Sequence, residues 1–214
     1  MKLIKVLCHT IFDCIAFVIN VFYSYKVGSS IRKTFYRKVY SKAIKKELKN
    51  AGKNFYIEGS AEIIGQKYIS IGDDFTCFAR LRMEAYDLHN GVRFNPEIVI
   101  GNNVGINYDC HIGCINKVMI GDNVLIASKV YITDHDHGET NEKDLEITPA
   151  KRVLYSKGPV IIGANVWIGE NVTILSNTNI GPNCIIGANS VVTKSFPSNS
   201  ILMGNPAKLF KSIK

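Results

Sequence analysis

The sequence lacks paired cysteines. No two of its six cysteines form a CxxC motif; they stand at positions 8, 14, 77, 110, 114 and 184. No group of cysteine and histidine residues has the ligand spacing of a structural zinc site. Unpaired cysteines are typical of proteins that remain in a reducing compartment. The sequence therefore predicts a cytoplasmic protein, in which Cys110 and Cys184 serve as small core residues.

An uninterrupted apolar run is also missing. Residues 3–25 are largely apolar, but His9, Asp13 and Asn20 interrupt them. A signal peptide needs a continuous apolar core, and a membrane-spanning helix needs about 20 residues with few or no charges. A helix that lies in the membrane interface fits better, because a basic run follows. The alternative is a helical cap packed on the end of the fold.

Negative charge is scarce. The 214 residues include 26 Lys and Arg against 18 Asp and Glu, a net charge of +8. Such an excess suits nucleic acid, an anionic membrane surface or a phosphate-bearing ligand. No nucleic-acid-binding motif accompanies the charge, so we expect no nucleic-acid partner. The length suits one domain with an elongated core.

What the sequence does contain is a six-residue repeat. From 162 to 192 an aliphatic residue occupies every sixth position: Ile162, Ile168, Ile174, Ile180, Ile186 and Val192. A period of six fits neither an α-helix nor a single strand. It fits a solenoid of short strands joined by tight corners. The aliphatic residues are therefore expected to point into its core.

The other hexad positions describe the corners. The fourth residue is always asparagine, the residue other than glycine that best tolerates a left-handed backbone: Asn165, Asn171, Asn177, Asn183 and Asn189. Pro182-Asn183 also suits the centre of a type II turn. The fifth residue is small or β-branched and is expected to point inward. Between the corners, Val166 and Ile168 should face the core and Trp167 the outside.

These hexads, with the closing Asn205-Pro206-Ala207-Lys208, resemble the hexapeptide-repeat acyltransferases. The resemblance covers residues 56–214. It implies an all-β fold, a left-handed parallel β-helix, whose first strand we expect near Tyr56. An N-terminal helical segment, residues 1–55, would precede it, and one extruded loop would interrupt it. The family also implies a homotrimer.

The repeat breaks after Ile132 and resumes near Val160, so the extruded loop spans 133–160. It begins with Thr133-Asp134-His135-Asp136-His137-Gly138. Long loops within a compact repeat are usually functional or disordered. The histidines and aspartates could ligate a metal, but the further ligands of a zinc site are not evident. They could equally form a general base with an orienting carboxylate, or a solvated polar loop.

The resemblance assigns roles to particular residues. It implies that His135 is the base that deprotonates a sugar hydroxyl, with His137 in reserve and Asp134 or Asp136 orienting the ring. Asn107 and Asp109 match the stretch that contacts the acceptor. Acetyl-CoA is the implied co-substrate, and no metal is required. The residues that match the coenzyme-binding positions are Trp167, Ala188, Thr193, Lys194, Lys208 and Lys211.

The stretch IASKVYITDHDHG, together with the apolar and basic N-terminal segment, most resembles O-acetyltransferases of bacterial surface-polysaccharide synthesis. That similarity implies acetylation of a sugar hydroxyl in O-antigen, capsule or exopolysaccharide, at the inner face of the cell membrane. Two alternatives remain open. One is N-acetylation of an amino or nucleotide sugar, and the other is a non-catalytic β-helix that serves as a binding module.

Overall fold

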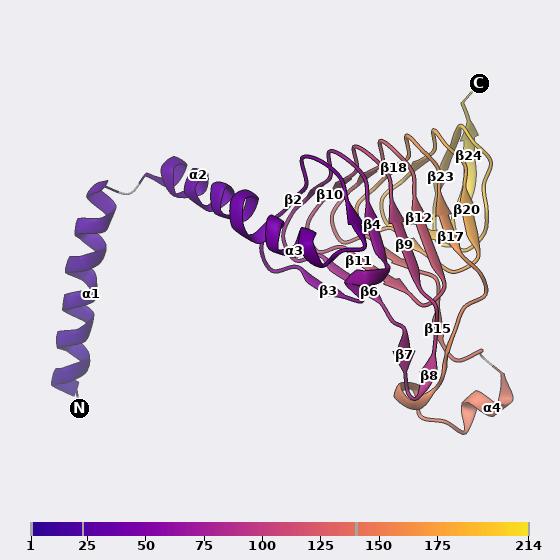
Figure 1. The fold of residues 1–214 in the computed structure, drawn as a ribbon, viewed down its shortest axis with the longest axis horizontal. Helices are drawn as coiled ribbons and strands as arrows, with labels where there is room; N and C mark the ends of the chain where they lie inside the picture. Colours follow the sequence, from indigo (N-terminus) through magenta and orange to yellow (C-terminus); the bar gives the residue numbers. More distant parts are fainter. Residues whose placement is uncertain (1, 23, 140, 214) are drawn as a thin grey trace.

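The computed structural model describes residues 2–22, 24–139 and 141–213. Most of the chain is wound into a left-handed parallel β-helix with three sheets around one core (Figure 1). A regular coil takes 18 residues, the separation of the stacked corner residues Asn165 and Asn183. The six-residue repeat therefore supplies one strand and one corner, and three repeats close a coil.

The strands stack in register within each sheet. The first sheet, sheet A, holds β1 (Asn50–Ala51), β4 (Ile69–Ile71), β9 (Glu97–Ile100), β12 (Lys117–Ile120), β17 (Val160–Ile162) and β20 (Thr178–Ile180). Sheet B holds β2 (Tyr56–Ile57), β5 (Thr76–Cys77), β10 (Gly105–Ile106), β13 (Leu125–Ile126), β18 (Trp167–Ile168), β21 (Ile185–Ile186), β23 (Ser200–Met203) and β24 (Lys208–Ser212). Sheet C holds β3 (Glu62–Ile64), β6 (Arg82–Ala85), β11 (His111–Cys114), β14 (Tyr131–Thr133), β19 (Thr173–Ile174) and β22 (Val191–Val192).

The core confirms the expected alternation of inward and outward residues. Ile168 and Ile174 are fully buried, and the small residues Cys110 and Cys184 also lie in the core. Trp167, between two inward residues, is 52% exposed. A closed coil buries two side chains of each hexad, such as Val166 and Ile168, on either side of an outward residue such as Trp167. The hydrophobic effect therefore selects the period of six.

The corner asparagines adopt the left-handed backbone that the sequence predicts, with φ between 58° and 61° in all five hexads. Their side chains also hydrogen-bond from coil to coil. Nδ2 of Asn165 donates to Oδ1 of Asn183 at 3.0 Å, and Asn183 donates to Asn199 at 2.9 Å. Asparagine thus satisfies both the backbone geometry and the polar groups of the corner.

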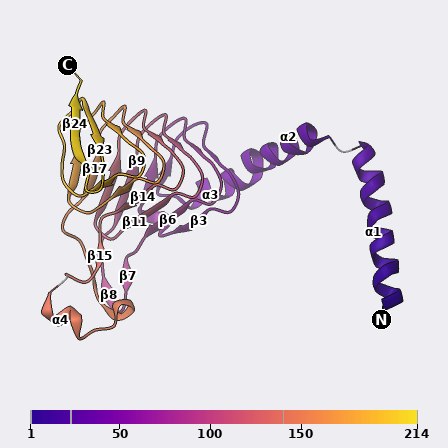
Figure 2. The same ribbon diagram turned by 180° about the vertical axis from the view of Figure 1, so that it is seen from behind.

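The N-terminal segment is helical. It contains α1 (Lys2–Phe22), α2 (Tyr25–Phe35), a π-helical turn (Tyr36–Tyr40) and α3 (Ser41–Glu47). The end of this segment caps the first coil, since buried Ser41 bonds through Oγ to the backbone of Ile57. Among the described residues, no helix is both long and apolar enough to cross a membrane. Both Figure 1 and Figure 2 show α1 away from the β-helix.

The β-helix starts six residues earlier than expected, because Asn50 already pairs with Ser70 of β4. Between β3 and β4 a 3-10 turn spans Gln66–Tyr68. At the other end, β24 turns back antiparallel to β23 and closes sheet B.

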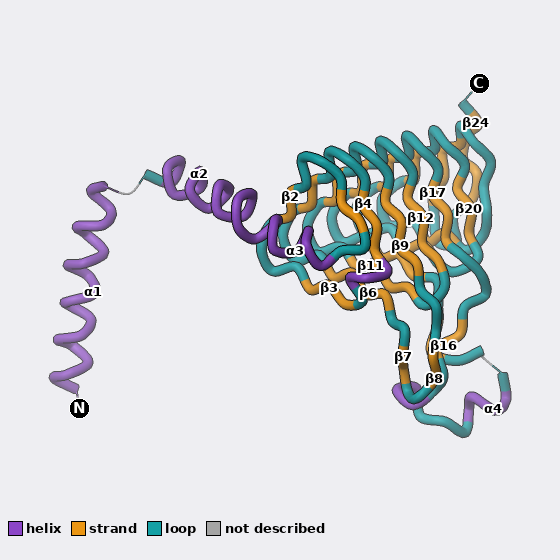
Figure 3. Tube along the Cα trace, viewed as in Figure 1, coloured by secondary structure: helices purple, strands orange, loops and turns teal. Residues whose placement is uncertain are grey.

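Two arms, rather than one extruded loop, leave the β-helix, and they lie side by side (Figures 1, 2 and 3). The expected loop 133–160 forms a long arm with β15 (Asp136–His137), α4 (Glu142–Leu145), a 3-10 turn (Pro149–Lys151) and β16 (Leu154–Tyr155). The unexpected short arm is the hairpin of β7 (Leu88–His89) and β8 (Val92–Arg93).

The short arm has a local signal in the sequence. Asn90 and Gly91 both have positive φ, at 48° and 81°, as a two-residue hairpin turn requires. Nδ2 of Asn90 then donates to the backbone oxygen of Ala150 in the long arm, at 2.9 Å. The two arms therefore support each other.

Candidate active site

The long arm begins where β14 ends, and this position fixes His135 and Asp134. Nδ1 of His135 lies 2.9 Å from Oδ1 of Asp134. The His135 side chain is 11% exposed, whereas Asp134 is fully buried. The backbone N–H of His135 also donates to Thr133 Oγ1, at 3.2 Å. A buried carboxylate thus orients a partly accessible imidazole.

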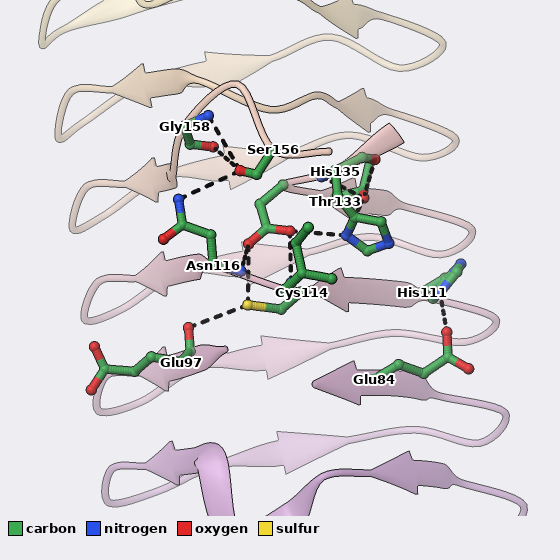
Figure 4. Close-up of polar contacts among 11 residues, drawn as sticks. Glu84, Glu97, His111, Cys114, Asn116, Thr133, His135, Ser156 and Gly158 are labelled. Atoms are coloured by element: carbon green, nitrogen blue, oxygen red, sulfur yellow. Dashed lines mark hydrogen bonds and ion pairs between the residues drawn. The ribbon is translucent and has the colours of Figure 1, made fainter. Parts of the chain in front are cut away.

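Asp134 is held by the neighbouring coil. Its carboxylate accepts the backbone N–H groups of Ile115 and Asn116 at 2.9 and 2.8 Å, and the Cys114 thiol at 3.2 Å (Figure 4). Burial raises the pKa of Asp134, but hydrogen bonds from His135 and from these groups outweigh it, so the net pKa is lowered. Asp134 is therefore ionised, and Nδ1 of His135 must donate to it.

The other loop residues face elsewhere. Asp136 instead pairs with Lys157, with 3.6 Å between Oδ2 and Nζ. His137, on β15, is exposed and packs edge-on against His89 of the short arm, with 5.8 Å between ring centroids. Geometry thus distinguishes the two aspartates, because Asp134 pairs with His135 and Asp136 pairs with Lys157.

Sequence reasoning missed two residues beside His135. Glu84 of β6 and His111 of β11 form a second carboxylate–imidazole pair, with 3.0 Å between Oε2 and Nε2. A Cβ atom on Gly113 would lie 3.1 Å from Cε1 of His135 and 3.7 Å from Nε2 of His111. The glycine leaves room for both rings at one point on the outer face of sheet C.

His89 is a third missed residue. Its Nδ1 is buried and has no hydrogen-bond partner within the described part of the chain. Desolvation lowers the pKa of His89, and the nearby His137 and His135 lower it further. The short arm therefore places a neutral imidazole close to the loop histidines.

The variable coil lengths explain why these neighbours were missed. The stacked corner residues Arg80 and Asp109 are 29 positions apart, because the short arm is inserted between them. Regular coils take 18 residues. The sequence did contain a signal for the short arm, the hairpin turn Asn90-Gly91. When the short arm is left out of the count, the repeat places β6 next to β11.

Asn107 and Asp109 lie at the edge of sheet C where its strands begin, whereas His135 lies at the edge where the strands end. They form the corner between β10 and β11, whereas His135 follows the far end of β14. Nδ2 of Asn107 donates to the Ile126 backbone at 3.0 Å. Asp109 pairs with Arg80, whose guanidinium holds its pKa low. One chain does not bring these two residues to His135.

The residues matched to coenzyme positions occupy different faces. Thr193 and Lys194 are exposed and follow β22 at the same edge of sheet C as His135. Trp167 lies on the outer face of sheet B, and Ala188 at the corner between β21 and β22. Lys208 and Lys211 are exposed on β24. Within one chain these residues do not form a single site.

Comparison with known proteins decides the family. Residues 159–194 match the model described as bacterial transferase hexapeptide (six repeats). A putative lipopolysaccharide biosynthesis O-acetyl transferase, WbbJ of Escherichia coli (strain K12), is 44% identical over 147 residues, which cover 67% of this chain and 71% of that protein. The chain belongs to the hexapeptide-repeat acetyltransferases.

Solved structures agree with the assignment of the chain to this family. A galactoside acetyltransferase in complex with coenzyme A is 27% identical, with a TM-score of 0.56, covering 87% of this chain and 79% of that one. A mutant of AntD, an N-acyltransferase from Bacillus cereus, in complex with dTDP and coenzyme A, has a TM-score of 0.65 at 23% identity, covering 81% and 89%. The latter likeness shows the fold alone.

Proposed function

We propose that this acetyltransferase moves the acetyl group of acetyl-CoA to a sugar hydroxyl during synthesis of a bacterial surface polysaccharide. The observation that carries the proposal is the His135 imidazole, oriented by buried Asp134 where the long arm leaves the β-helix. The putative lipopolysaccharide O-acetyl transferase supports the substrate class. The galactoside acetyltransferase bound to coenzyme A supports the co-substrate.

The proposed chemistry uses the free nitrogen of His135. Because Nδ1 donates to Asp134, Nε2 carries the lone pair in the neutral ring. Nε2 removes the proton from the acceptor hydroxyl, and the oxygen attacks the thioester carbonyl carbon. The tetrahedral intermediate then breaks its carbon–sulfur bond. The imidazolium returns the proton to the coenzyme A sulfur, so no covalent enzyme intermediate is required.

A homotrimer is part of the proposal. Thr193 shares an edge with His135, whereas Trp167 lies on sheet B, so one coenzyme could contact both only between two chains. Sheet B also presents an apolar column, since Leu125, Trp167 and Ile185 pair in register and point outward. Sedimentation equilibrium is expected to give three chains. A stable monomer at assay concentration would exclude the shared site.

The test of the reaction is mass spectrometry of sugar acceptors incubated with acetyl-CoA and the protein. Surface-polysaccharide repeat units and methyl glycosides should gain one acetyl group. Mild alkali should remove it, because esters are cleaved where amides persist. An alkali-stable product would support N-acetylation instead, and no product with any acceptor would favour a binding module.

We also propose that the N-terminal segment attaches the protein to the inner face of the cell membrane. Apolar side chains of α1 and α2 are exposed, among them Phe12 at 69% and Phe17 at 72%. A hollow of about 830 Å³ between the helices and sheet B is lined by Lys33, Arg37, Lys38, Lys42 and Lys45. Apolar and cationic groups together favour anionic membrane surfaces.

Deleting residues 1–25 should strongly weaken binding to vesicles that contain phosphatidylglycerol, because it removes the apolar side chains of α1, while circular dichroism of the β-helix is retained. The capping contacts of Tyr40 and Ser41 remain in this variant. Vesicles of phosphatidylcholine alone are the control for charge. An unfolded deletion variant would show instead that these residues are required for folding.

A further inference from the structure

The hollow between the N-terminal helices and sheet B carries an excess of positive charge. Five cationic side chains line it, and Asp74 is the one acidic residue among the described residues around it. Asp74 already accepts a hydrogen bond from Nδ2 of Asn54, at 2.8 Å. None of the ion pairs among the described residues involves Lys33, Lys38 or Lys42. A cleft lined by charge of one sign concentrates counter-ions, so this hollow should attract an anionic ligand.

The side of the helical segment that faces the first coil is cationic rather than apolar. Arg37 lies over the Tyr56 ring, with 5.7 Å between Cζ and the ring centroid. Ser41 bonds to the backbone of β2, and Lys45 donates to a backbone oxygen of the first coil. Lys33, four residues before Arg37, extends this row, because positions four apart share one face of a helix. A helix face that packs on a core is normally apolar, so these cations indicate a role besides capping.

The apolar residues of α2 lie on its opposite side, and Figure 1 shows α2 extending away from the first coil. Ile31 is 65% exposed and Phe35 is 53% exposed. Each is two residues from Lys33, which corresponds to about 200° around a helix. A membrane that takes up Ile31 and Phe35 therefore leaves Lys33 directed toward the β-helix. The cations of the hollow can hold a separate anionic group while the membrane contact proposed above persists.

The dimensions of the hollow suit two phosphate groups better than one. Its volume of about 830 Å³ is that of a small-molecule site. Lys33 and Lys42 are about 13 Å apart along the helical segment, so a single phosphate group cannot contact both. Arg37 and Lys38 lie between them in the sequence. An arginine can bind a phosphate through two parallel N–H groups, and a lysine binds it as a point charge.

We propose that this hollow is a binding site for a diphosphate group, separate from the site of His135. The ligand class is a diphosphate ester, carried by a membrane lipid or by a soluble nucleotide. Phe55 and Phe78, which also line the hollow, provide apolar surface for the group that the diphosphate carries. The inference goes beyond the proposed acetyl transfer and does not depend on it.

Calorimetric titration of the full-length protein with inorganic pyrophosphate, without vesicles, tests the site. At one ionic strength, pyrophosphate should bind at least about tenfold more tightly than inorganic phosphate, because it contacts more of the cations. The double variant Lys38→Gln/Lys42→Gln should lose about tenfold or more in pyrophosphate affinity. Both lysines are exposed, so this variant should fold, and circular dichroism checks that it does.

The matched control is Arg32→Gln/Lys46→Gln. It removes the same charge from exposed positions of the same helical segment, but neither residue lines the hollow. This variant should lose less than about threefold in pyrophosphate affinity, because exposed charges act weakly through solvent. Equal losses in the two double variants would overturn the proposal, since the cations would then act only as diffuse surface charge. Equal affinity of the wild-type protein for phosphate and pyrophosphate would also overturn it.

Displacement of pyrophosphate identifies the carrier of the diphosphate. Farnesyl diphosphate in phosphatidylcholine vesicles represents a lipid, and uridine diphosphate represents a soluble nucleotide. The one that displaces pyrophosphate at the lower concentration assigns the carrier, and either result supports the site. If neither displaces it, the hollow accepts no diphosphate ester and the proposal fails. These measurements require no turnover, so failure of this site and failure of the proposed acetyl transfer are distinguishable.

Discussion

The regular coils from Val160 to Val192 and the edge of sheet C that carries the arms are built from the same strands and corners, but they bury different groups. In the coils the inward residues are aliphatic or small. At the edge, Glu84 and Asp134 are the only buried carboxylates in the described chain. The first region stabilises the fold by burying apolar area. The second removes charged groups from water and compensates them with hydrogen bonds.

This difference shows where a repeat protein can accommodate catalytic residues. Inside a coil stacked between two others there is little room for a side chain larger than the repeat residue. An insertion breaks the stacking on one edge only, and the coils above and below still hold that edge. Asp134 accepts N–H groups of Ile115 and Asn116 from the preceding coil, so the rigid repeat orients the histidine of the arm.

The largest expected effect is loss of turnover without loss of the coils. His135→Ala should lower kcat by about two to four orders of magnitude, the usual contribution of a general base. The coils should remain folded, although the unfolding temperature should fall somewhat because buried Asp134 loses one hydrogen-bond partner. The measurement is steady-state acetyl transfer with coenzyme binding checked separately. His137→Ala, whose ring is exposed on β15, should cost much less; the opposite ranking would assign the base to His137.

A core substitution in the regular coils should instead lower stability and leave activity unchanged. Ile168→Ala should lower the free energy of unfolding by about 2–5 kcal/mol, because the cavity cannot be refilled between fixed strands. Activity per folded molecule should be retained. Ile168→Val, which removes less volume, should cost about 1 kcal/mol. Urea unfolding measures both, and equal losses would mean that the coil relaxes around the cavity.

The substitution Asp134→Asn tests how the stability at this edge of sheet C depends on pH. The pKa of Asp134 is lowered from 3.8, so its ionised form stabilises the protein above that pH, and the stabilisation is lost as pH falls through the lower, folded-state pKa. Asp134→Asn should lose about 2 kcal/mol at pH 7, because buried N–H groups lose an acceptor.

The urea midpoint, measured from pH 7 down to about pH 2, should therefore fall less steeply below pH 3.8 in Asp134→Asn than in wild type. Asp109→Asn removes a surface carboxylate that is also paired, and it should change the slope less. Identical slopes for wild type and Asp134→Asn would show that Asp134 does not titrate with folding.

The smallest expected effect is at a corner of the coils. Asn183→Ala should cost about 1–2 kcal/mol, because alanine is strained at φ 58° and cannot join the side-chain ladder. Asn183→Gly relieves the strain and loses only the ladder bonds. If the two variants are equally unstable in thermal unfolding, the hydrogen bonds of the ladder outweigh the backbone strain.

The sequence by itself was enough for the architecture. Period-six aliphatic residues, asparagine corners and the outward Trp167 predicted a solenoid of short strands and the facing of its residues, and the family resemblance implied the left-handed β-helix. These features are local, since each hexad specifies its own strand and turn. The break after Ile132 likewise placed His135 and Asp134 at the start of a long arm.

The tertiary structure alone decided which groups meet. It separated Asp134 from Asp136, paired Glu84 with His111, revealed the short arm, and placed Asn107 away from His135. It also divided the N-terminal segment into a cap around Ser41 and exposed apolar helices. The physical reason is that contacts between coils depend on how many residues each coil contains. The separation of stacked corner residues ranges from 16 to 42 positions along this chain, so sequence separation does not indicate proximity there.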